Sequence, residues 1–234
     1  MVFAEGSDER VLRAAVTYQR SGMGKALVVG REDDVKMRLD GAGLGDAVRE
    51  LTVVNAANTP HLDAYKDFLY ERLYRKGFDS TDIHRLAARD RHVFSALMLA
   101  HGHADGLVTG ATRKSAHVLG LMNHVFDVSA GDDVVGVTAI LHRGRIVLIT
   151  DTLVYEWPDE TDLANIAERG ADVARALGLE PRVAFLSFST FGYPVSERAE
   201  KMHRAPDVLE ARNVGFEFEG EMTVDVALNA QAQE

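Results

Sequence analysis

The chain has 234 residues, which is long enough for one large or two small domains with a substantial core. A hydrophobic fraction of 46%, a charged fraction of 26% and the absence of cysteine are typical of a globular protein and exclude disulfides, thiolate metal sites and a cysteine nucleophile. The net charge of −10 argues against a nucleic-acid-binding surface, and without a signal-like N-terminus or an apolar run of about 18 residues we expect a cytoplasmic protein with no membrane span.

In the first half of the chain, short apolar runs alternate with helical patterns. The predicted strands are residues 2–4, 25–30, 51–54 and the run that leads into 105–111. The first predicted helix follows a cap at Ser7 or Asp8, and later helices cover residues 33–39, 62–75, 79–102 and 115–126. Strands that alternate with helices predict a parallel sheet with right-handed crossovers.

The second half opens with a different pattern. Residues 134–141 and 146–150 are apolar runs separated by four residues, and this spacing, with Gly144 in the turn, predicts a β-hairpin. Helix 159–177, strand 183–188, helix 196–209 and strand 214–218 are then expected. We place a domain boundary near residues 130–133, which predicts one α/β subdomain at 1–130 and a second at 131–234.

Candidate ligand-binding residues follow the predicted strands, at the edge where open α/β folds bind ligands. Thr109 and Gly110 end the fourth strand, and the glycine permits close backbone approach. Arg113 and Lys114 come next, beside a helix start, where cations suit a phosphate group. A solvated basic pair is the alternative interpretation of these two side chains.

Hydroxyl groups and a glycine end a later strand. Ser189, Thr190 and Gly192 would offer backbone N–H groups and hydroxyl donors to an anion. The alternative is that these residues only satisfy their own loop and cap the next helix. Asp151 follows an apolar strand and has the same two interpretations, whereas the carboxylate of Glu221 is a weak candidate for acid–base work.

Four segments together resemble the phosphotransacetylase family, and more closely the phosphotransacetylase-like domain at the C-terminus of bacterial malic enzymes. They are DGLVTGA (105–111), DTLVYEWP (151–158), FSTFG (188–192) and EGEMTVD (219–225). The resemblance implies an α/β, three-layer parallel-sheet fold of the isocitrate/isopropylmalate dehydrogenase-like type in two subdomains. It also implies a substrate-binding role for Arg89, although pairing with Asp90 is an equal alternative.

Some residues depart from the pattern of active phosphotransacetylases. Leu153 and Tyr155 replace a small residue and an asparagine, Glu219 replaces an aspartate, and Met222 matches the malic enzyme branch. In the family, the key Ser-Arg pair, a second arginine and the aspartate base lie in a further C-terminal segment that this sequence lacks. We therefore expect a domain taken from a larger polypeptide and catalytically inactive by itself.

The resemblance implies a regulatory and oligomerising domain of an NADP-dependent malic enzyme that binds acetyl-CoA or another CoA ester without turnover. NADP and a divalent metal would belong to the N-terminal malic enzyme domain of the parent chain, and no cofactor to this fragment. The alternatives are an active phosphate acetyltransferase and a ligand-free assembly module, in which Trp157 and Phe191 would serve a homo-oligomer contact. His101 and His103 lack partners at metal-binding spacing, so no metal site is expected.

Overall fold

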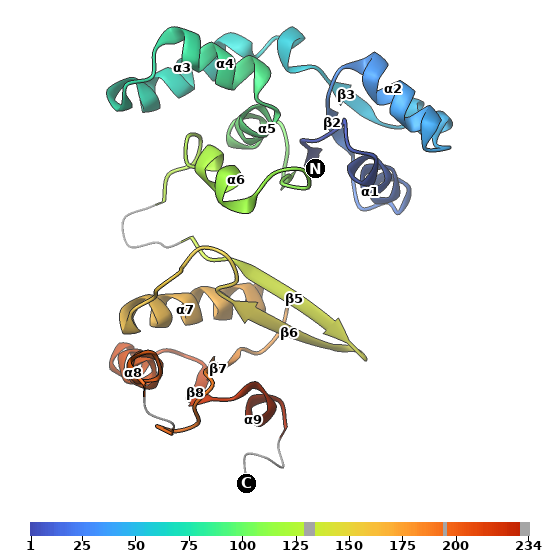
Figure 1. Ribbon diagram of the computed structural model, residues 1–234. Helices are drawn as coiled ribbons and strands as arrows, with labels where there is room; N and C mark the ends of the chain where they lie inside the picture. Colours follow the sequence, from blue (N-terminus) through green and yellow to red (C-terminus); the bar gives the residue numbers. More distant parts are fainter. Residues whose placement is uncertain (129–133, 194–195, 230–234) are drawn as a thin grey trace. The chain divides into compact units, whose positions relative to one another are not determined.

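A computed structural model describes residues 1–128, 134–193 and 196–229 (Figure 1). The chain separates into two units, Met1–Asp127 and Val128–Glu234, which we call unit 1 and unit 2. The boundary expected near residues 130–133 lies outside the described residues. None of the helices in the described parts is long and apolar enough to cross a membrane.

The sheet of unit 1 has four parallel strands in the order β3-β2-β1-β4. The strands are β1 (Val2–Phe3), β2 (Leu27–Val29), β3 (Thr52–Val54) and β4 (Leu107–Val108). The α-helices are α1 (Glu9–Arg20), α2 (Glu32–Gly41), α3 (Leu62–Leu73), α4 (Ser80–Arg89), α5 (Arg91–Ala100) and α6 (Ser115–Met122), with 3-10 turns η1 (Gly45–Arg49), η2 (Ala56–Asn58) and η3 (Tyr74–Lys76). The predicted parallel α/β organisation is confirmed.

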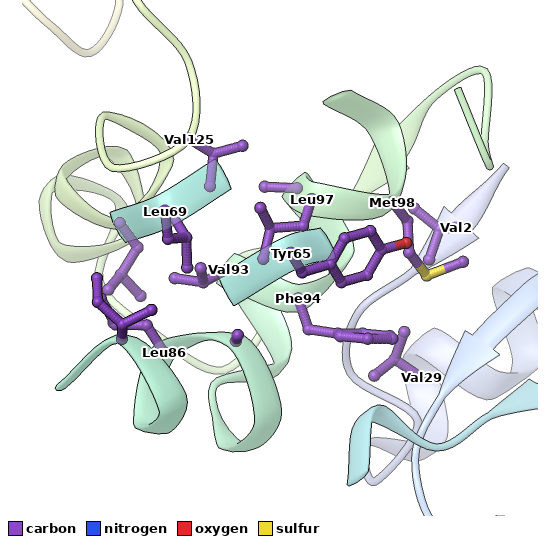
Figure 2. Close-up of a cluster of buried hydrophobic side chains, with 14 of the residues drawn as sticks. Val2, Val29, Tyr65, Leu69, Leu86, Val93, Phe94, Leu97, Met98 and Val125 are labelled. Atoms are coloured by element: carbon purple, nitrogen blue, oxygen red, sulfur yellow. The ribbon is translucent and has the colours of Figure 1, made fainter. Parts of the chain in front are cut away.

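Helices cover both faces of this sheet. Alternate strand residues point to opposite faces, so Val2 belongs to one buried cluster and its neighbour Phe3 to another. The cluster on the Phe3 side draws on α1 and α2, whose buried residues include Leu12 and Leu39. The cluster on the Val2 side draws on α3, α4 and α5 (Figure 2). Unit 1 therefore has three layers.

The larger cluster is arranged around Tyr65 and the apolar face of α5. Figure 2 shows the Tyr65 ring among Phe94, Leu97 and Met98. Burial raises the pKa of Tyr65 to about 12. Its hydroxyl shares a hydrogen bond of 2.6 Å with Nδ1 of His103, so the polar end of this buried ring has a partner.

One predicted helix is two helices in the structure. The sequence pattern predicts a single helix over 79–102, but Asp90 is extended, with φ −91° and ψ 108°, and separates α4 from α5. Its carboxylate accepts hydrogen bonds from the backbone N–H groups of His92 and Val93. The prediction of one helix was wrong because Asp90 makes a strong N-cap in the middle of an otherwise helical pattern.

Unit 2 contains the predicted hairpin and a separate parallel pair. The hairpin is β5 (Val137–His142) and β6 (Arg145–Thr150), closed by Arg143 and Gly144, both with positive φ as in a type I′ turn. The parallel pair is β7 (Arg182–Leu186) and β8 (Glu217–Met222). Strand β8 begins three residues after the predicted start at residue 214. The helices are α7 (Glu160–Ala176), α8 (Glu197–Arg212) and α9 (Val224–Leu228).

The core of unit 2 lies between α7, α8 and the parallel pair. Leu163, Ala167, Phe185 and Leu209 are its central buried residues. At the pairing irregularity after Phe185, Gly220 has φ 140°, and a Cβ there would lie 2.9 Å from the carbonyl oxygen of Phe185. Only glycine fits this close approach of β8 to β7, which brings the next residue, Glu221, beside the end of β7.

Candidate functional site

The carboxyl ends of β1 and β4 form the first candidate site, which we call the Glu5 site (Glu5, Arg91, His92, Thr109 and Thr112). Glu5 follows β1 and is fully buried. Its carboxylate accepts hydrogen bonds from the backbone N–H groups of Ala111 (2.7 Å) and Thr112 (2.9 Å) and from the Thr112 hydroxyl. Burial alone would raise the pKa of Glu5, but these donors outweigh it and hold the pKa below 4.5.

Arg91 joins the two loops of this site. Its Nη1 donates to the hydroxyl of Ser7 at 2.9 Å, and its Nη2 donates to the hydroxyl of Thr112 at 2.8 Å. Nη2 also lies 3.9 Å from a carboxylate oxygen of Glu5. The guanidinium therefore links the segments after β1 and β4, which are far apart in the chain and adjacent in the sheet.

The hydroxyl of Thr109 is used inside the protein. Thr109 Oγ1 and His92 Nδ1 share a hydrogen bond of 2.6 Å. Burial lowers the pKa of His92 below its ordinary value of 6.5, so the imidazole is neutral at pH 7. Nε2 of His92 is buried without a hydrogen-bond partner among the described residues.

The predicted basic residues lie on the loop that begins at Gly110, which has φ 94°. Arg113 and Lys114 are exposed, and Arg113 donates a hydrogen bond of 3.1 Å to Nε2 of His117. Arg89 is exposed at the end of α4, and among the described residues no hydrogen bond or ion pair links it to the Glu5 site. Arg91, two residues later, is the arginine held at the strand ends.

The carboxyl ends of β7 and β8 form the second candidate site, which we call the Glu221 site (Ser187, Ser189, Gly192, His203 and Glu221). Oε1 of the fully buried Glu221 accepts hydrogen bonds from the Ser189 hydroxyl (3.0 Å) and the Gly192 N–H (2.7 Å). The hydroxyls of Ser187 and Ser189 share a further bond of 2.9 Å. Ser189, Gly192 and Glu221, each predicted separately as a ligand residue, are therefore brought together.

The other carboxylate oxygen of Glu221 has no hydrogen-bond partner among the described residues. It lies 3.6 Å from Nδ1 of His203, beside a small cavity of about 90 Å³. The lining residues are Gly192, Ser196, Ala199, Glu200, His203 and Glu221. Thr190 adjoins this site through its backbone, which pairs with that of Tyr193.

Asp151 organises its own loop. Its carboxylate accepts backbone hydrogen bonds from Gly136, Leu153, Val154 and Tyr155, at 2.6 to 3.0 Å. Burial would raise the pKa of Asp151, but the four donors outweigh burial and lower it. These contacts of Asp151 fit the loop-bonding alternative, and none of them connects it to the Glu221 site.

Both sites share one arrangement that sequence reasoning missed. In each site, a buried glutamate at the end of one strand accepts hydrogen bonds from hydroxyl and N–H groups of the loop that follows the neighbouring strand. The sequence signal for Glu5 was its position directly after the first strand, where parallel strands bring their carboxyl ends together. Nothing local marked Arg91, His92 or His203. Among the described residues, no group of histidine, aspartate and glutamate is arranged to hold a metal ion.

Comparison with known proteins shows the family of this chain. The phosphate acetyl/butaryl transferase family model matches residues 1–234. The chain is 43% identical to an NADP-dependent malic enzyme of Rhizobium meliloti over its whole length, and 27% identical to a phosphate acetyltransferase of Thermoanaerobacterium thermosaccharolyticum. It covers 31% of the first protein and 72% of the second, so it spans about a third of the malic enzyme relative.

Solved structures agree. A phosphotransacetylase from Streptococcus pyogenes has a TM-score of 0.84 at 26% identity, with 100% of this chain and 70% of that one covered. The EutD phosphotransacetylase from Staphylococcus aureus has a TM-score of 0.82 at 26% identity, with 99% and 71% covered. The fold is therefore the α/β fold of these enzymes, and the chain belongs to the phosphate acetyl/butaryl transferase family.

Proposed function

We propose that this chain is a phosphotransacetylase-like regulatory unit of a malic enzyme that binds acetyl-CoA without transferring the acetyl group. The observation that carries the proposal is the 43% identity to a malic enzyme over all 234 residues, against 27% to a phosphate acetyltransferase. NADP and a divalent metal would belong to the remaining two-thirds of such a polypeptide. Regulation needs only a difference in affinity between two conformations.

The loop after β4, next to the Glu5 site, supports binding of a phosphorylated ligand. Gly110 allows close backbone approach, and the exposed Arg113 and Lys114 follow it directly. Because CoA esters carry several phosphate groups, these cations are suited to hold one of them by charge-assisted hydrogen bonds.

Two of the carboxylates at the strand ends, those of Asp151 and Glu5, support the absence of turnover. Acetyl transfer from acetyl phosphate needs a base that removes the thiol proton of CoA. Asp151 has a lowered pKa and four backbone donors, and Glu5 has a lowered pKa and three donors. A carboxylate whose charge is already stabilised in this way is a poor base, so neither residue is suited to this step.

Calorimetric titration of acetyl-CoA into the chain, followed by an acetyl phosphate assay on the same sample, tests both halves of the proposal. We expect binding and no acetyl transfer. Transfer would instead support an active phosphate acetyltransferase, the second candidate, which is favoured by the similarity that spans all of this chain and 72% of such an enzyme. No binding would contradict the proposed function.

The double variant Arg113→Ala/Lys114→Ala tests the location. We expect weaker acetyl-CoA binding, with about 1–3 kcal/mol lost for each charge-assisted contact. The matched control is Arg31→Ala/Lys36→Ala, which removes the same charge from exposed positions at α2. Equal affinities of the two double variants would remove Arg113 and Lys114 from the binding site.

We also propose that the unit assembles into a homo-oligomer. Trp157 and Phe191 are 62% and 57% exposed in the single chain and would supply apolar surface to such a contact. Size-exclusion chromatography with and without acetyl-CoA tests this. If the oligomeric state is the same with and without acetyl-CoA, and the chain does not bind acetyl-CoA, only a structural role in assembly would remain.

A further inference from the structure

The side chain of Arg91 retains hydrogen-bonding capacity after its contacts are counted. A guanidinium has five N–H donors, and the hydrogen bonds to Ser7 and Thr112 use one on Nη1 and one on Nη2 of Arg91. Its Nε–H is buried without a hydrogen-bond partner among the described residues. The side chain is 32% exposed, so the second N–H groups of Nη1 and Nη2, and not the buried Nε–H, are the donors left for a ligand.

The buried carboxylate of Glu5 forms an ion pair with the guanidinium but takes none of its hydrogen-bond donors. Glu5 accepts three hydrogen bonds from Ala111 and Thr112, and its nearest approach to the guanidinium is 3.9 Å. An ion pair at that distance is long for a direct hydrogen bond. Glu5 therefore fixes the loop that holds Thr112, and Thr112 in turn fixes Arg91.

Further cations lie on this loop or contact it from α1. Arg10 donates a hydrogen bond of 3.1 Å to the carbonyl oxygen of Ala111, although Asp8 neutralises it through an ion pair of 2.9 Å. Arg113 and Lys114 are exposed on the residues that follow. Arg91, fixed at the start of α5, and the exposed cations of the loop after β4 together make a donor set for a group with several anionic oxygens.

We propose that Arg91 is the anchor of a phosphoryl-binding subsite at the carboxyl ends of β1 and β4. The inference rests on the proposed function only for its natural ligand, in which the diphosphate of a CoA ester would occupy the subsite. The chemistry recognised is a phosphoryl group, and inorganic diphosphate and acetyl-CoA share it. Ser7 and Thr112 are positioning residues, because they hold the guanidinium and leave its remaining donors to the ligand.

The test compares Arg91→Gln and Arg91→Lys with the wild-type chain by calorimetry. The probes are inorganic diphosphate, acetyl-CoA and acetyl-pantetheine, which carries the same thioester without phosphate groups. We expect Arg91→Gln to raise the dissociation constants of diphosphate and acetyl-CoA by about tenfold to a hundredfold. Arg91→Lys keeps the charge but loses the fork, so we expect a smaller increase. The dissociation constant of acetyl-pantetheine should not change.

Two further variants separate binding from folding. Arg85→Gln is the matched control, because Arg85 is exposed on α4, pairs with Asp82 at 2.7 Å and lies outside the loop. Ser7→Ala keeps Arg91 but removes one anchor, and we expect a weakening of a few-fold for diphosphate. Thermal unfolding of every variant establishes that the protein is folded in the titrations.

The outcomes distinguish this subsite from the proposed function. Arg91-dependent binding of diphosphate without any binding of acetyl-CoA would support the subsite and contradict the proposed function. Binding of acetyl-CoA that Arg91→Gln leaves unchanged would overturn the subsite and retain the proposed function. A wild-type chain that binds none of the probes would overturn both proposals. If Arg85→Gln lost as much affinity for diphosphate as Arg91→Gln, the subsite alone would be overturned.

Discussion

Glu5 and Glu221 have the same role in the two units. Each is fully buried, each lies at the end of a parallel strand, and each accepts hydrogen bonds from the loop of the adjacent strand. A buried carboxylate is costly unless donors compensate its charge, so these loops are shaped around the glutamates. The two glutamates therefore already accept the hydrogen bonds of several loop donors that a ligand anion could otherwise use. These donors are on Ala111, Thr112, Ser189 and Gly192.

Glu5→Gln should destabilise unit 1 at neutral pH by about 1–3 kcal/mol, because buried N–H and O–H donors lose a charged acceptor. The folded-state pKa of Glu5 is below 4.5, so its stabilisation is present above pH 4.5 and is lost as the pH falls through the folded value. The stability difference between wild type and Glu5→Gln should therefore shrink below about pH 4.5. Urea unfolding across this range measures it.

The control for this prediction is Glu71→Gln on the exposed surface of α3, which should stay within about 0.5 kcal/mol of the wild type. A difference between wild type and Glu5→Gln that stays constant as the pH falls would contradict the assigned role of the Glu5 charge.

The break between α4 and α5 decides which arginine reaches the strand ends. A continuous helix would place position 91 on a helix interior, whereas the cap at Asp90 makes Arg91 the first residue of α5. From there its guanidinium reaches Ser7 and Thr112. The family resemblance implied Arg89. The apolar positions before and after Asp90 follow helical spacing, so they do not reveal the change of direction that brings Arg91 to the strand ends.

Asp90→Ala should lower the free energy of unfolding by about 0.5–2 kcal/mol, because the N–H groups of His92 and Val93 lose their acceptor. Asp90→Asn should cost much less, since asparagine caps about as well as aspartate. Chemical denaturation of both variants measures the difference. Equal losses would show that the charge of Asp90, and not its capping geometry, is what matters.

At the scale of the whole molecule, the buried clusters belong to separate units. The two clusters around the four-stranded sheet lie within residues 1–126, and the third draws only on residues 163–218. The single tryptophan of the sequence, Trp157, lies in unit 2. Its fluorescence therefore reports on unit 2, while far-ultraviolet circular dichroism reports on both.

Leu97→Ala should destabilise unit 1 by about 2–5 kcal/mol, because Leu97 is fully buried in the α5 cluster (Figure 2). We expect the dichroism transition to move to lower temperature and the Trp157 fluorescence transition to move less. Leu177→Ala in unit 2, at a side chain 54% exposed, should leave both within about 0.5 kcal/mol. Equal shifts of the two transitions in Leu97→Ala would mean that the units unfold as one.

The sequence by itself determined the order of strands and helices, because apolar periodicity and turn residues are local signals. The hairpin closed by Arg143 and Gly144 and the buried face of α1 (Val11, Leu12, Ala15 and Val16) follow from them directly. The sequence also pointed to the strand ends as the candidate site, since parallel sheets bring those ends together.

Only the tertiary structure decided how the site residues are used. Glu5 and Thr112 are 107 positions apart in the chain, and Ser189 and Glu221 are 32 apart. No local pattern encodes such pairs, because they depend on the strand order and register of the folded sheet. Because of that order, the loop donors bond to buried glutamates and Arg91 bonds to two loops at once. The sequence pattern did not reveal either arrangement.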